Sequence, residues 1–198
     1  MQTLLKSIMH GAAALALTGW ATQAACAAEE DAWVSEARGI AKTLPPKLVS
    51  VLNEEIAKGG PENAINVCRE KAPQMAKIAS EQTGWQVRRV SLRHRNPKAV
   101  PDAWEQAALL DFDRRAAAGE DPAKLERSEL VNDNGRLVYR YVRALPTQPM
   151  CLSCHGPAEQ LSPSVLGQFK TLYPDDHATG YASGQLRGAI TLRKPAQP

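Results

Sequence analysis

A pentapeptide in the C-terminal quarter of the chain, Cys151-Leu152-Ser153-Cys154-His155, constrains the fold more than any other feature. Two thiols separated by two residues, with an imidazole directly after the second, act together only if the fold presents all three groups to one ligand. The C-x-x-C-H pattern is typical of c-type haem attachment. There, each thiol forms a thioether with one vinyl group of the porphyrin, and the histidine lies under the iron. Cys151 and Cys154 are therefore predicted to bind one haem c covalently, with His155 as an axial ligand.

Two alternatives use the same residues. Cys151 and Cys154 could form a disulfide, or they could supply half of a zinc site. A zinc site of this kind needs a second C-x-x-C or H-x-x-x-H cluster, and the sequence contains neither. Haem attachment is therefore the favoured interpretation.

The first 27 residues have the layout of a secretory signal peptide. Lys6 precedes an apolar run from Ala12 to Leu17, and small residues follow, ending in Ala25-Cys26-Ala27. We expect cleavage near residue 27 and export of a mature domain, residues 28–198, to the periplasm. That length suits a single domain with its own core.

Membrane attachment is the minor alternative. Cys26 could become a lipidated first residue, but Gln23 stands where a lipoprotein signal normally has an apolar side chain. No later stretch approaches the roughly 20 apolar residues of a membrane-spanning helix, so we expect no membrane span.

Composition and motifs exclude several function classes. The formal net charge is only +3 and both signs mix along the chain, which does not indicate nucleic-acid binding. The sequence contains no Ser-His-Asp set, no H-E-x-x-H and no Gly-rich phosphate loop. We therefore expect a protein that is not an enzyme.

Cys68 is left without a disulfide partner once Cys151 and Cys154 are assigned to haem. An odd thiol in an exported protein indicates an intermolecular disulfide, a buried inert thiol or a metal ligand. Cys68 lies on an apolar stripe at helical spacing, which predicts a buried position, and Pro73 should kink or divide this helix. Most cysteines on such a stripe are small core residues, but a haem iron that needs a sixth ligand offers Cys68 a second role.

The order of predicted elements indicates an α+β domain on an antiparallel sheet. Helices come first, strands interrupted by helices follow, and no βαβ rhythm is present. The expected helices cover 31–43, 46–58 and 61 onward, then one capped by Asp102 with Glu105 and one opened by Ser162-Pro163. The expected strands cover 85–92, a hairpin of 129–131 with 136–145 turned at Asn134-Gly135, and 186–192.

Four arginines gather around the first predicted strand: Arg88, Arg89, Arg93 and Arg95. This cluster would suit haem propionates. It would equally suit a solvated basic loop.

Four segments together resemble one known family. They are Ala64 to Pro73, which contains A-I-N-V-C, Ser91 to Glu105 with Arg95-Asn96-Pro97, Cys151 to Gly156, and Leu172-Tyr173-Pro174 through Gly188-Ala189-Ile190. In this order they are similar to the Tll-type c-haem domain family, and the resemblance covers nearly all of the mature chain. It implies a PAS-like fold and an exported sensor module or free-standing cytochrome.

The resemblance also implies the ligand set, with the iron held by His155 and by Cys68 of the A-I-x-V-C motif. The other candidates for the sixth ligand are His94, His177, Met75 and Met150. Histidine–thiolate ligation would leave no open position and favour ferric iron. Two roles follow: redox or gas sensing, with carbon monoxide or nitric oxide as ligand and a separate signalling protein as partner, or periplasmic electron transfer with a redox partner protein.

Overall fold

The computed structural model describes the backbone of residues 18–196 and the side chains of residues 32–196. Most of the expected signal peptide, including the side chain of Cys26, lies outside these residues, and its cleavage stays a prediction. None of the helices within residues 18–196 combines the length and apolar character needed to cross a bilayer.

A four-stranded, wholly antiparallel sheet forms the centre of the domain, with strand order β1-β4-β3-β2. The expected hairpin is confirmed: Asn134 and Gly135 both adopt positive φ, of 53° and 85°, as the two residues of a type I′ turn do. Three strands, β2, β3 and β4, are longer than predicted because pairing with a neighbour extends them past their apolar residues, whereas β1 is shorter than predicted. Their bounds are β1 Gln86–Val90, β2 Glu126–Asp133, β3 Arg136–Pro146 and β4 Leu186–Pro195.

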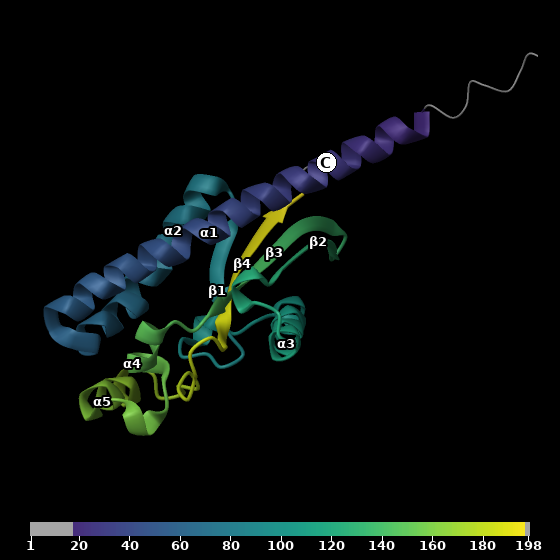
Figure 1. The fold of residues 1–198 in the computed structure, drawn as a ribbon. Coiled ribbons are helices and arrows are strands. Elements are labelled where there is room, and N and C mark those ends of the chain that lie inside the picture. Colours follow the sequence, from purple (N-terminus) through teal and green to yellow (C-terminus); the bar gives the residue numbers. More distant parts are fainter. Residues whose placement is uncertain (1–17, 197–198) are drawn as a thin grey trace, which may run out of the picture.

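Helices cover both faces of the sheet (Figure 1). Helix α1 (Thr18–Asn66) crosses one face, where Trp33 stacks on Tyr139 with ring centroids 4.8 Å apart. Helix α3 (Ala103–Ala117) packs Phe112 and its neighbours against the other face. The period-2 alternation of the strands supplies both cores: Val87, Tyr141, Ile190 and Leu192 face α1, and Val90, Val142, Ala144 and Ala189 face α3. The α+β prediction is therefore confirmed.

The predicted break at Pro45 and Pro46 is wrong, because α1 continues through both prolines. Proline fixes φ near the helical value, so its cost in a helix lies in a lost hydrogen bond and local crowding. Trp33, Ala37 and Ala41 hold this helix against the sheet, and that packing outweighs the cost. The predicted stop at Gly59-Gly60 is confirmed, since Gly60 takes a φ of 74° that other residues rarely adopt.

A short π-helix, η1 (Val67–Lys71), separates α1 from α2 (Ala72–Thr83). The amide of Ala72 donates to the Val67 carbonyl, five residues back rather than four. Pro73 follows at once and has no amide to donate, which explains why regular α-helical bonding is interrupted here. The predicted division beside Cys68 is therefore confirmed, in the form of a π turn.

Helix α3 begins with the predicted capping box. The Asp102 carboxylate accepts from the Glu105 amide, and the Glu105 carboxylate accepts from the Asp102 amide, both at 2.9 Å. Glu105 is also buried and forms ion pairs with Arg88 at 2.9 Å and Arg140 at 3.3 Å. This carboxylate therefore ties α3 to both β1 and β3.

Replacing Glu105 by alanine should lower the free energy of unfolding by about 3 kcal/mol, because it breaks the capping box and leaves the buried Arg140 guanidinium with Asp102 as its one carboxylate in the described residues. Urea denaturation measures the change. Glu120→Ala is the matched control: this exposed carboxylate pairs with Arg115 at 2.8 Å, and its loss should cost less than about 1 kcal/mol. Equal losses from the two variants would show that the buried network does not stabilise the fold.

The C-terminal part of the chain supplies short helices at one end of the sheet (Figure 1). These helices are η4 (Pro149–Cys151), α4 (Leu152–His155), η5 (Ala158–Gln160) and α5 (Pro163–Leu172). As predicted, Ser162 caps α5 by accepting from the Val165 amide at 3.1 Å. Two further single turns are η2 (Pro97–Ala99) and η3 (Pro122–Lys124).

Candidate functional site

The C-x-x-C-H motif occupies η4 and α4, directly after β3. Pro149 opens η4, and the helical turn that follows places Cys151 and Cys154 one turn apart, with His155 next. Gly156 closes α4 by donating to the Leu152 carbonyl at 2.9 Å. A Cβ at position 156 would lie 2.6 Å from that oxygen, so glycine is required for this tight exit from the motif.

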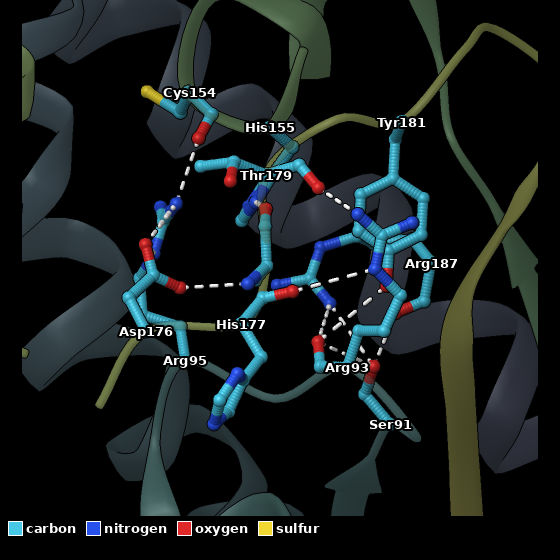
Figure 2. A network of polar contacts seen from close by, with 11 residues as sticks. Ser91, Arg93, Arg95, Cys154, His155, Asp176, His177, Thr179, Tyr181 and Arg187 are labelled. Atoms are coloured by element: carbon cyan, nitrogen blue, oxygen red, sulfur yellow. Dashed lines mark hydrogen bonds and ion pairs between the residues drawn. The ribbon is translucent and has the colours of Figure 1, made fainter. Parts of the chain in front are cut away.

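His155 is held in one orientation by the loop that leads to β4 (Figure 2). Its Nδ1 lies 2.7 Å from the Ala178 carbonyl oxygen and donates to it, which leaves Nε2 for another ligand. The His155 carbonyl accepts from the Tyr181 amide at 2.9 Å, and the Tyr181 ring stands edge-on to the imidazole, 6.4 Å away. Burial lowers the pKa of His155 well below its usual range, and the charge of Arg187 adds to the effect. The imidazole is therefore neutral at pH 7, the form that binds metal.

Cys68 projects from η1 and is solvent-accessible, so its predicted burial in the core is wrong. The surrounding protein nevertheless raises the pKa of its thiol by desolvation. Cys68 therefore combines solvent access with a partly desolvated thiol and is not part of a packed core. The apolar stripe does not run unbroken through Cys68 because the π turn changes the phase of the helix there.

The fold brings Cys68 to the motif. Ile65, one turn earlier on the same helical face, is buried in a cluster with Leu161, Val165 and Phe169, and Cys154 packs against this cluster. Charge on Cys151 raises the pKa of Cys68, and charge on Cys68 adds to the burial that raises the pKa of Cys154. The three thiols therefore lie within the range of direct electrostatic interaction.

The structure separates the four clustered arginines. Arg88 turns to the α3 face and pairs with Glu105, and Arg93 donates to the Thr179 carbonyl. Arg95 pairs with Asp176 at 2.9 Å and donates to the Cys154 carbonyl at 2.8 Å, so it supports the motif directly. Arg89 lies within electrostatic range of two of the thiols, since the charges of Cys68 and Cys151 raise its pKa, which desolvation lowers.

The remaining ligand candidates lie in other surroundings. The rings of His177 and His94 form an edge-to-face pair 5.7 Å apart, and the His177 ring points away from Cys154 and His155 in Figure 2. Met150 lies next to Cys151, and its carbonyl accepts from Ser153. Met75 lies on α2, beyond the π turn.

The two alternative readings of the motif find no support within residues 32–196. Cys68, Cys151 and Cys154 are free thiols. Across those same residues, no three His, Cys, Asp or Glu side chains are grouped to hold a metal ion such as zinc. A cavity of about 480 Å³ lies beside the site, between α3 and the loop before β4, and it shares Arg93 and Tyr181 with the site but no cysteine or histidine.

Three participants have no clear sequence signal: the Ala178 carbonyl, the Tyr181 ring and Arg187. The carbonyl belongs to the backbone, which every residue carries. Arg187 is buried in β4. The signal for it in the sequence is a charged residue at the start of an apolar strand, because arginine is rarely buried without a partner.

Comparisons with known proteins agree with this fold. The Tll0287-like family pattern matches residues 8–195. The solved structure described as the cyanobacterial heme-protein Tll0287 superposes with a TM-score of 0.63 at 24% identity, covering 82% of this chain and 94% of that one. A comparison with curated proteins found no significant match. Since the family pattern spans nearly the whole chain, this protein belongs to the Tll0287-like family.

Proposed function

We propose that this protein is an exported monohaem c-type cytochrome that senses redox state or a small gas. Cys151 and Cys154 would attach the haem, and His155 and Cys68 would hold its iron. The observation that carries the proposal is the fixed His155, bound through Nδ1 with Nε2 left over, directly after Cys154, whose thiol interacts electrostatically with Cys68. The likeness to a fold described as a heme protein supports it.

The donor set fits the cofactor. A neutral imidazole nitrogen and a cysteine sulfur are both established axial ligands of haem iron. The carbonyl bonded to Nδ1 fixes the tautomer and raises the basicity of Nε2, as second-shell partners of metal-binding histidines do. The apolar cluster of Ile65, Leu161, Val165 and Phe169 beside Cys154 would cover part of a porphyrin.

The two axial side chains differ in how firmly the chain holds them. His155 is tied by the Ala178 carbonyl and by the Tyr181 amide. Cys68 is solvent-accessible and lies on a π turn, where regular α-helical hydrogen bonding is interrupted and functional sites are frequent. We infer that Cys68 is the side chain that leaves. A haem bound there would supply a redox-active iron and, once Cys68 had left, a position for carbon monoxide or nitric oxide.

The proposed location is the periplasm, and the proposed partner is a separate signalling or redox protein, with no catalytic role. Mass analysis of the mature N-terminus tests export and should place it near residue 28. A chain that began at a diacylated Cys26 would instead be membrane-anchored.

Visible spectra of the purified protein test the function. The oxidised protein should show a six-coordinate, low-spin haem, and the reduced protein should bind carbon monoxide as Cys68 leaves. A reduced form that stays six-coordinate and does not bind the gas would favour electron transfer. Protein matured in a haem-attaching periplasm but lacking haem would refute both roles.

A further inference from the structure

Two arginines beside the site have no carboxylate partner in the part of the chain that the structure describes. The Arg89 side chain forms no hydrogen bond or ion pair there. Arg187 is buried, and its Nη1 donates only to uncharged oxygens, Ser91 Oγ and the Arg93 carbonyl, both at 3.2 Å. Its Nε has no acceptor within residues 32–196.

Burial makes the charge of Arg187 costly. Desolvation lowers the pKa of Arg187 to about 9, and the like charge of Arg89 adds to the effect. Arg89 is solvent-accessible, yet the surrounding protein still lowers the pKa of its guanidinium by desolvation. A guanidinium withdrawn from water without a counter-ion costs several kcal/mol, so Arg187, with Arg89 beside it, is suited to an anionic group.

Local structure explains why both side chains reach the site. Arg89 follows the alternation of β1 and shares the face of Val87, which α1 covers. Arg187 is the extra residue of a β-bulge in β4. On β3, Leu145 pairs with Gly188 and the next residue, Pro146, pairs with Leu186, so Arg187 has no partner in the register. A bulge redirects a side chain out of the regular alternation.

The two arginines lie near the two axial ligands. The Arg187 guanidinium is 5.2 Å from the centre of the Tyr181 ring, which in turn stands against His155 (Figure 2). Arg89 is the largest of the charges that oppose the burial-driven rise in the Cys68 pKa. Arg95, the third guanidinium of the site, already pairs with Asp176.

We propose that Arg89 and Arg187 bind the two propionate carboxylates of the haem. One haem carries two carboxylates, and charge-assisted pairs with them are strong because arginine presents a planar fork of donors. Arg93, which also has no carboxylate partner in the described residues, is instead held by the Thr179 carbonyl. This inference rests on the proposed function. It assigns Arg89 and Arg187 a positioning role that also sets the charge around the iron.

Redox titration of the haem-loaded protein between pH 5 and pH 9 tests the assignment, with covalent haem checked separately on a stained denaturing gel. Arg89→Gln and Arg187→Gln should shift the ferric-to-ferrous equilibrium at pH 7 about tenfold toward ferric, because each removes one positive charge near the iron. Each should also add a pH dependence between about pH 5 and pH 8, as a buried carboxylate without its cation titrates. The potential should fall as pH rises through that range, because the ionised carboxylate favours ferric iron.

Arg193→Gln is the matched control. It removes a guanidinium from the same strand as Arg187, but one that pairs with Asp133 at the hairpin end. Arg89→Gln keeps the test decisive if Arg187→Gln does not fold, because the Arg89 side chain has no hydrogen bond or ion pair in the described residues to lose. Haem-loaded variants that titrate like Arg193→Gln would overturn this assignment alone. A wild-type protein without covalent haem would overturn the proposed function, and this assignment with it.

Discussion

A Cys68→Ala variant is expected to keep its covalent haem but to lose the low-spin ferric spectrum of the wild type. Cys151 and Cys154 are untouched, so attachment should proceed normally. Without the thiolate, the ferric iron should become high-spin or bind water, and the reduction potential should rise by about 0.1 V or more, since axial ligands span about 0.8 V in haem proteins. Electron paramagnetic resonance and redox titration measure the two effects.

His177→Ala and Met75→Ala are the controls for Cys68, and both should leave the ferric spectrum nearly unchanged. The His177 ring is paired with His94 and is exposed. Met75 lies on the far side of the π turn. If Cys68→Ala kept the wild-type resonance spectrum and His177→Ala lost it, the protein would be a bis-histidine cytochrome, better read as an electron carrier.

Replacing Cys154 by alanine is expected to remove most of the covalently bound haem. Cys154 would supply one of the two proposed thioethers and directly precedes His155, the proposed axial ligand. Its side chain packs against the apolar cluster of Ile65, Leu161, Val165 and Phe169. The readout is peroxidase-type haem staining at the protein band on a denaturing gel, after maturation in the periplasm. Acid extraction of the wild type should leave the haem on the protein.

Ser153→Ala is the matched control for Cys154, because it lies in the same turn, and its hydroxyl donates only to the Met150 carbonyl, at 2.9 Å, and weakly to the Cys154 sulfur. It should stain as strongly as the wild type. A full-strength haem signal that acid extraction removes from the wild type would show that the haem is not covalently attached.

Local signals predicted the elements well where a few neighbouring residues decide the structure. The capping box at Asp102 and Glu105, the turn at Asn134-Gly135 and the cap at Ser162 are all present. Each depends on a side chain bonding to a backbone group within three residues, or on a φ that favours Asn or Gly. Such interactions do not require knowledge of the rest of the chain.

Predictions failed where packing or a change of helical phase intervened. The prolines at 45 and 46 do not end α1, because contacts of Trp33 and Ala37 with the sheet support the helix. Cys68 is accessible instead of buried, because the period of 3.6 residues was carried across a π turn. Propensity and periodicity describe an isolated helix and cannot include either effect.

By itself, the sequence determined the C-x-x-C-H motif, the thiol at Cys68 that has no partner once the motif is assigned to haem, and the order of helices and strands. These follow from residue type and spacing along the chain. Only the tertiary structure decided that Cys68 lies within electrostatic range of the motif, that Ala178 holds Nδ1 of His155, and that no acid within residues 32–196 forms an ion pair with Arg187. The Ala178 carbonyl is 23 residues from His155, and Ser91 is 96 residues from Arg187. Contacts across such distances are set by how the sheet and its bulge bring segments together, which no local pattern encodes.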